Sequence, residues 1–144
     1  MTHPLTIEEQ IRNLDRFAGD HLKIAAMLMA TESNALGVLN ASVGNAAICL
    51  AGVLLRHAAP ERAEFVDEHA DLVREVGPHL EEPARVRCLE LVGERLGVAF
   101  VMWGPDRRTA VEWIAEQLDL VRWLASKVGF HVPNELEAMA RNFR

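Results

Sequence analysis

Apolar residues recur every three or four positions along most of the chain, and this spacing predicts helices. The first such run begins at Thr6, where Thr6-x-x-Glu9 is a capping box, a reciprocal pairing of side chains with backbone amides that starts helices. The run ends near residues 31–34, where residues with weak helix preference cluster. No stretch alternates apolar and polar residues for long enough to predict a strand.

The next run, residues 33–55, carries no charged side chain. At about 1.5 Å per residue, a helix of this length could cross a bilayer. However, Asn40, Ser42 and Asn45 lie in its middle, and polar groups are costly in lipid. We therefore expect a buried central helix that other helices surround, with no membrane contact. The pattern leaves open whether this helix is separate from the first or continues it as one bent helix.

Prolines and glycines mark the ends of the later runs. Helices are predicted over residues 60–76, 83–103, 106–128 and 134–143. The helix over 83–103 has apolar residues around much of its surface, so we expect it to be well buried beside the central helix. The sequence thus predicts an all-α fold, a single domain over residues 1–144 built as a bundle of five or six helices around the apolar central helix.

The composition narrows the function classes. The formal net charge is −6 at pH 7 and the isoelectric point is about 5.5. An acidic protein repels the phosphates of nucleic acids and the anionic headgroups of membranes, so we expect neither as a partner. Cys49 and Cys88 lack the spacing of a zinc site and are predicted to be reduced, buried thiols. Residues 1–20 contain four acids and no apolar core of a signal peptide, which favours the cytoplasm.

No motif for catalysis, a metal or a cofactor is present. Di-iron bundles need Glu-x-x-His on paired helices, and this four-residue motif does not occur. Glu61-x-x-Glu64 resembles half of a carboxylate Mg²⁺ site, but Gly93 and Gly97 occupy the positions three residues after Glu90 and Glu94. We therefore predict no catalytic residue, no metal ligand and no cofactor.

Four polar residues on otherwise apolar faces form a candidate ligand pocket. They are His21, Asn40, Asn45 and His69. Buried polar groups need hydrogen-bond partners, and a small molecule could supply them. For His69 and His21, a bond to a backbone carbonyl within the core is the competing interpretation.

An acidic stripe on the helix that begins at Pro60 forms a candidate interface. The residues of this interface are Glu61, Glu64, Glu68, Asp71 and, on a later helix, Trp123. Tryptophan is enriched among interface anchors, although a partly buried core position would explain Trp123 equally well. The leading interpretation is a non-enzymatic regulator or adaptor that presents an acidic helical surface to another protein. The alternative is a small-molecule-binding or enzymatic bundle. Because several helices carry more apolar surface than a small bundle needs, we also expect a homodimer.

Overall fold

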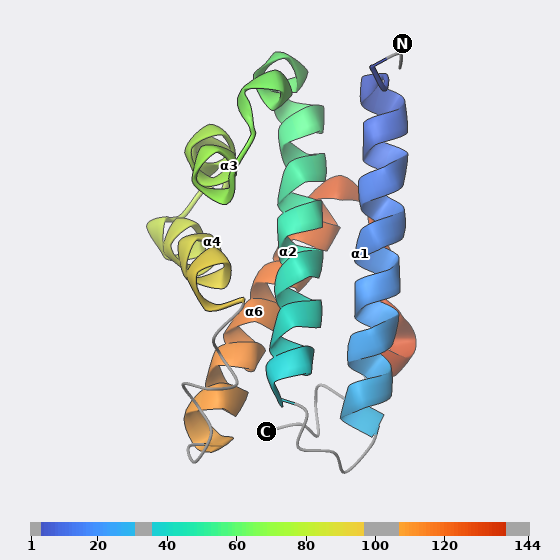
Figure 1. Cartoon of the computed structure of the whole chain (residues 1–144), viewed down its shortest axis with the longest axis vertical. Coiled ribbons are helices and arrows are strands. Elements are labelled where there is room, and N and C mark those ends of the chain that lie inside the picture. The colour runs from blue at the N-terminus through green and yellow to red at the C-terminus, as the bar shows by residue number, and fades with distance from the viewer. Residues whose placement is uncertain (1–3, 31–35, 97–106, 138–144) are drawn as a thin grey trace.

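The structure, a computed structural model, describes residues 4–30, 36–96 and 107–137 (Figure 1). Its helices are α1 (Ile7–Ala30), α2 (Leu36–Ala58), α3 (His69–Val76), α4 (Pro83–Arg95) and α6 (Arg107–Val128), with short 3₁₀ helices η1 (Pro60–Phe65) and η2 (Gly77–His79). Residues 134–137 are also helical. None of the described residues forms a strand, and the all-α prediction is confirmed.

Helices α1 and α2 are separate and antiparallel, so the alternative of one bent helix is wrong (Figure 1). The capping box forms as predicted: the Glu9 amide donates to Thr6 Oγ1, and the Thr6 amide donates to Glu9 Oε1, both at 3.1 Å. Near the other end of α2, Arg56 Nε donates to Gln10 Oε1 at 2.9 Å. This bond fastens the C-terminal turns of α2 to the start of α1.

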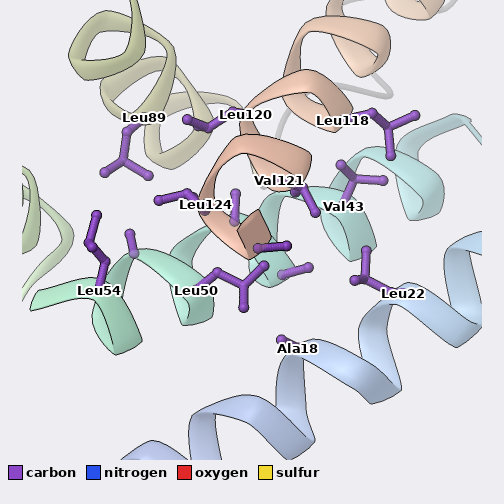
Figure 2. Close-up of a cluster of buried hydrophobic side chains, with 14 of the residues drawn as sticks. Ala18, Leu22, Val43, Leu50, Leu54, Leu89, Leu118, Leu120, Val121 and Leu124 are labelled. Carbon is purple, nitrogen blue, oxygen red and sulfur yellow. The ribbon is translucent and has the colours of Figure 1, made fainter. Parts of the chain in front are cut away.

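Helix α2, which carries no charged side chain before Arg56, is central, as predicted, and packs mainly against α1 and α6. Figure 2 shows Leu22 of α1, Val43 and Leu50 of α2, and Val121 and Leu124 of α6 in one buried apolar cluster. Helix α2 is long and apolar enough to cross a membrane, but 72% of its most apolar window is buried inside the protein. Burial of this kind is what the core helix of a helical bundle shows.

Helix α4 is less buried than predicted. Only Leu89 and Val92 are buried among the residues of this helix. The expected broad apolar face depended on residues 98–103, which lie outside the part of the chain that the structure describes. Within its described length α4 carries charged side chains on its outer side, and α6 takes the place beside α2.

The prediction of a single helix over residues 60–76 is wrong. Residues 60–65 form η1, the chain becomes extended at Val66 (φ −100°, ψ 104°), and α3 begins at His69. Asp71 Oδ2 accepts the backbone amides of Glu68 at 3.1 Å and Asp67 at 3.2 Å. A carboxylate that binds the amides before a helix starts the helix at that point, which separates α3 from η1.

Helix α6 ends as its sequence predicts. Gly129 has φ +74°, and the amide of Phe130 donates to the carbonyl of Ala125 at 2.9 Å. This is the Schellman arrangement, in which glycine accepts the left-handed conformation at no steric cost. The chain then returns along α6, where Arg122 pairs with Glu137 at 3.0 Å.

Candidate functional site

The most connected polar group in the core is Asn40. Its Oδ1 accepts hydrogen bonds from Trp113 Nε1 at 2.9 Å and Gln117 Nε2 at 2.6 Å, and its Nδ2 donates to the carbonyl of Arg95 at 3.0 Å. Asn40, Trp113 and Gln117 are almost fully buried. The protein itself therefore satisfies Asn40, and this cluster links α2, the end of α4 and α6.

Gln117 reaches into this cluster because Gly44 leaves room for it. A methyl group at position 44 would lie 3.1 Å from Gln117 Oε1 and 2.7 Å from Leu96 Cδ2. Gln117 Oε1 is buried and has no hydrogen-bond partner among the described residues. The glycine that weakens α2 as a helix thus permits close packing of a polar side chain against its backbone.

His69 packs on the backbone of α4. Its Nε2 donates to the carbonyl of Leu89 at 2.7 Å, since a carbonyl can only accept. A methyl group at position 93 would overlap the imidazole ring, so Gly93 is what admits the ring. The other ring nitrogen, Nδ1, is buried and lacks a partner within the residues that the structure describes. The bond to a backbone carbonyl fits the interpretation of His69 as a core histidine, the alternative to a ligand-binding residue.

A groove with a volume of about 480 Å³ lies between α3 and α4. Its lining residues are His69, Ala70, Val73, Arg74, Glu90, Gly93 and Glu94. Of the four candidate pocket residues, only His69 contributes to it.

The other candidate pocket residues have separate surroundings. Asn45 Nδ2 donates to the carbonyl of Ala41 in its own helix at 2.8 Å, and His21 is partly exposed on α1. No hydrogen bond joins any two of His21, Asn40, Asn45 and His69 in the described part of the chain. A shared pocket for these four residues stays a prediction without a geometric basis.

The candidate acidic interface is divided between two elements. Glu61 and Glu64 are exposed on η1, and Glu68 is exposed just before α3. Asp71 serves the start of α3 and pairs with Arg74 at 3.1 Å. The amide of Glu68, followed by that of Asp67, holds the pKa of Asp71 below its ordinary value. Asp71 therefore has a structural task, while the three glutamates face solvent.

Arg62 holds η1 against α3. Its Nε and Nη2 donate to both carboxylate oxygens of Glu75, at 2.7 and 2.9 Å, and this bond lowers the pKa of Glu75. The guanidinium also lies 4.5 Å from the centroid of the Phe65 ring. Because a 3₁₀ helix repeats every three residues, Arg62 and Phe65 share one edge of η1, and Glu61 and Glu64 share another. Phe65 remains 49% exposed.

Trp123 lies on α6 among cations. The Arg85 guanidinium is 4.2 Å and Lys127 Nζ is 5.3 Å from the centroid of its ring. The indole also packs against the main apolar core and is only partly exposed. Its role as an interface anchor stays a prediction, and its contacts also suit the core interpretation.

The titratable groups of the described residues bear on two kinds of chemistry, a metal site and an activated thiol. No group of three or more His, Cys, Asp or Glu residues within the described ranges could hold a metal ion. Burial raises the pKa of both Cys49 and Cys88 to about 11, so neither is an activated thiol.

Comparisons with protein-family models, with curated proteins and with solved structures found no match for this chain.

Sequence reasoning missed Gln117 and Phe65. Gln117 occupies the apolar stripe of α6, one turn after Trp113 and one turn before Val121, and a polar residue in such a stripe is a signal for a buried hydrogen bond. Phe65 carried no such signal, because its exposure follows from the break between η1 and α3.

Proposed function

We propose that this protein is a non-enzymatic interaction protein that binds a basic surface of another protein through η1 and the turn that follows it. The observation that carries the proposal is Phe65, which is half-exposed on the same short helix as the exposed Glu61 and Glu64 and three residues before the exposed Glu68. Aromatic residues are enriched in interfaces between proteins.

The surroundings of Phe65 support recognition of a cationic partner. The bidentate bond from Arg62 to Glu75 fixes the orientation of η1 before binding, which reduces the entropy that binding costs. The carboxylates of Glu61 and Glu64 point along one edge, where they would attract lysine or arginine side chains and speed association. A net charge of −6 acts in the same direction. The expected setting is the cytoplasm, where a regulator or adaptor of this kind would meet its partner.

The test compares two double variants with matched charge changes. Glu61→Lys with Glu64→Lys reverses two exposed carboxylates on η1, and Glu112→Lys with Glu116→Lys reverses two on α6. Proteins retained by the immobilised wild type are identified and purified, and their affinity is measured by calorimetry at low and moderate salt. The η1 variant is expected to bind at least about tenfold more weakly, while the α6 variant keeps the wild-type affinity.

A third variant, Phe65→Ser, separates the apolar contribution from the charges. It is expected to weaken binding at both salt concentrations, since an apolar contact is not screened. Equal affinities for wild type and the η1 variants would refute the proposal. Measurable turnover of a small molecule by a protein that retains no partner would refute it as well.

The alternative, small-molecule binding, is supported by the groove between α3 and α4. Its lining combines apolar walls from Val73 and Gly93 with charged groups, which is the general character of ligand sites. Screening a fragment library by NMR tests it. Shift changes confined to the amides of Val73, Glu90 and Gly93 would favour the alternative, and changes scattered over the surface would argue against it.

A further inference from the structure

The outer face of α1 carries large apolar side chains that remain partly exposed among the described residues. Phe17, Ile24 and Met27 are 48%, 42% and 69% exposed. At 100° per residue, the three lie within about 80° of one another around the helix, away from the buried row of Ala18, Leu22 and Ala25. A helix with apolar residues on two sides has one face more than its own bundle uses.

A row of charges runs beside this apolar face. Arg16, Asp20 and Lys23 are all exposed and follow one another at spacings of four and three residues. They are neighbours on the helix surface, and their signs alternate. Although oppositely charged residues are adjacent, none of the three is in an ion pair within the described ranges.

We propose that this face of α1 binds the same face of a second copy of the chain, with the two helices antiparallel about a two-fold axis. In a two-fold interface the same patch meets itself, so a patch must be complementary to its own reversed copy. Asp20 and Lys23, an acid and a base one turn apart, meet this condition. When the patch is reversed in the matching register, Asp20 lies beside Lys23 of the second copy, and Lys23 lies beside Asp20 of the second copy.

Pairing Asp20 with Lys23 of the second copy fixes the register of the two helices. In this register Phe17 lies level with position 26 of the second copy, between Ile24 and Met27 along the helix. A parallel arrangement would instead place each charge beside its own copy, and like charges repel. The complementarity of Asp20 and Lys23 to their own reversed copies is the reason to assign this face to a second copy.

The interface is small, since it uses one face of one helix from each chain. Association costs translational and rotational freedom, and only the surplus of buried apolar contact appears as affinity. We therefore expect a dimer with a micromolar dissociation constant.

Sedimentation equilibrium over a range of concentrations tests the proposal. The mean mass of the wild type is expected to rise from 16.0 kDa towards twice that value. Ile24→Asp is expected to remain monomeric, because it places a carboxylate in the centre of the apolar face. Phe65→Glu is the matched control, since it replaces an equally exposed apolar residue on η1 and should dimerise like the wild type.

Charge exchange distinguishes a second copy from any other occupant. Asp20→Lys alone and Lys23→Asp alone each place like charges in contact and should each weaken dimerisation about tenfold or more. An equimolar mixture of the two variants should recover a heterodimer, because one chain then supplies the cations and the other the acids. Since all these residues are exposed, the variants are expected to keep the helical circular-dichroism spectrum of the wild type.

Three results would overturn the proposal. They are a wild type that stays monomeric throughout the series, a dimer that Ile24→Asp does not weaken, and a mixture of the charge variants that fails to associate. The surface on η1 is separate from the face of α1, so the two proposals can fail independently. Loss of partner binding in Phe65→Ser with unchanged dimerisation would bear on the proposed function and leave the proposed dimer as it is.

Discussion

Gln117 of α6 donates a hydrogen bond of 2.6 Å to Asn40 of α2, joining two positions that are 77 residues apart. The same oxygen of Asn40 accepts the indole N–H of Trp113. Both bonds are buried in the core, where an unmatched polar group costs free energy. Asn40, a polar residue that would be costly in a membrane span, thus connects α2 to α6 and to the end of α4.

The first prediction concerns Asn40. Asn40→Ala should lower the free energy of unfolding by about 3 kcal/mol, because it leaves the donors of Trp113 and Gln117 and the carbonyl of Arg95 unpaired in the core. Urea unfolding measures the change. Asn45→Ala is the matched control, and a loss below about 1 kcal/mol is expected because its side chain bonds only within its own helix. Equal losses in the two variants would contradict the assigned role of the cluster.

The second prediction concerns Gly93, where the usual effect of alanine should reverse. Alanine normally stabilises a helix interior by about 1 kcal/mol relative to glycine. At position 93 its methyl group would overlap the His69 ring, so Gly93→Ala should instead destabilise the protein by about 1–3 kcal/mol. Gly19→Ala is the control: its nearest outside atom would be Phe130 Cζ at 3.9 Å, an ordinary contact, and stabilisation by about 0.5–1 kcal/mol is expected. Thermal and urea unfolding of both variants show whether each substitution raises or lowers the free energy of unfolding.

A third prediction follows from the lowered pKa of Asp71. Hydrogen bonds from the amides of Glu68 and Asp67 lower this pKa below its ordinary value of 3.8. A carboxyl group with a lower pKa in the folded state stabilises the protein above the pKa of the unfolded state, and this contribution is lost as the pH falls through the folded pKa. Asp71→Asn should therefore reduce stability at neutral pH, and its difference from the wild type should shrink steadily below about pH 4. Urea unfolding at several pH values measures it. A stability difference between Asp71→Asn and the wild type that does not change with pH would show that the negative charge of Asp71 does not contribute to stability.

The fourth prediction concerns the thiols. Burial raises the pKa of Cys49 and Cys88 from 9.0 to about 11, which makes the thiolate fraction at pH 8 about a hundredfold smaller. The native protein should react slowly with Ellman's reagent, and protein unfolded in guanidinium should react rapidly with two equivalents. The single variants Cys49→Ser and Cys88→Ser show how fast each of the two cysteines reacts by itself in the native protein. Rapid modification of the native protein would place an accessible thiolate where the structure has a partly buried thiol.

Much of the bundle could be predicted because its signals are local. The capping box at Thr6 and the glycine at position 129 each depend on residues within a few positions of one another, and the uncharged run over residues 33–55 is continuous in the sequence. Burial of apolar surface then requires α2 to be covered, whichever helices cover it. The break between η1 and α3 was missed although it is also local, because the Asp71 carboxylate competes with a continuous helix that the apolar pattern equally suits.

The sequence by itself determined that this chain forms helices and that the uncharged one lies at their centre, since helical periodicity and hydrophobicity act over short distances. Only the tertiary structure decided which side chains satisfy the polar groups in that helix. The bond between Asn40 and Gln117, the His69 ring on Gly93 and the exposed face of α1 depend on how helices distant in sequence pack together. Such contacts are set by the shape of several side chains at once, and no periodicity in one segment encodes them.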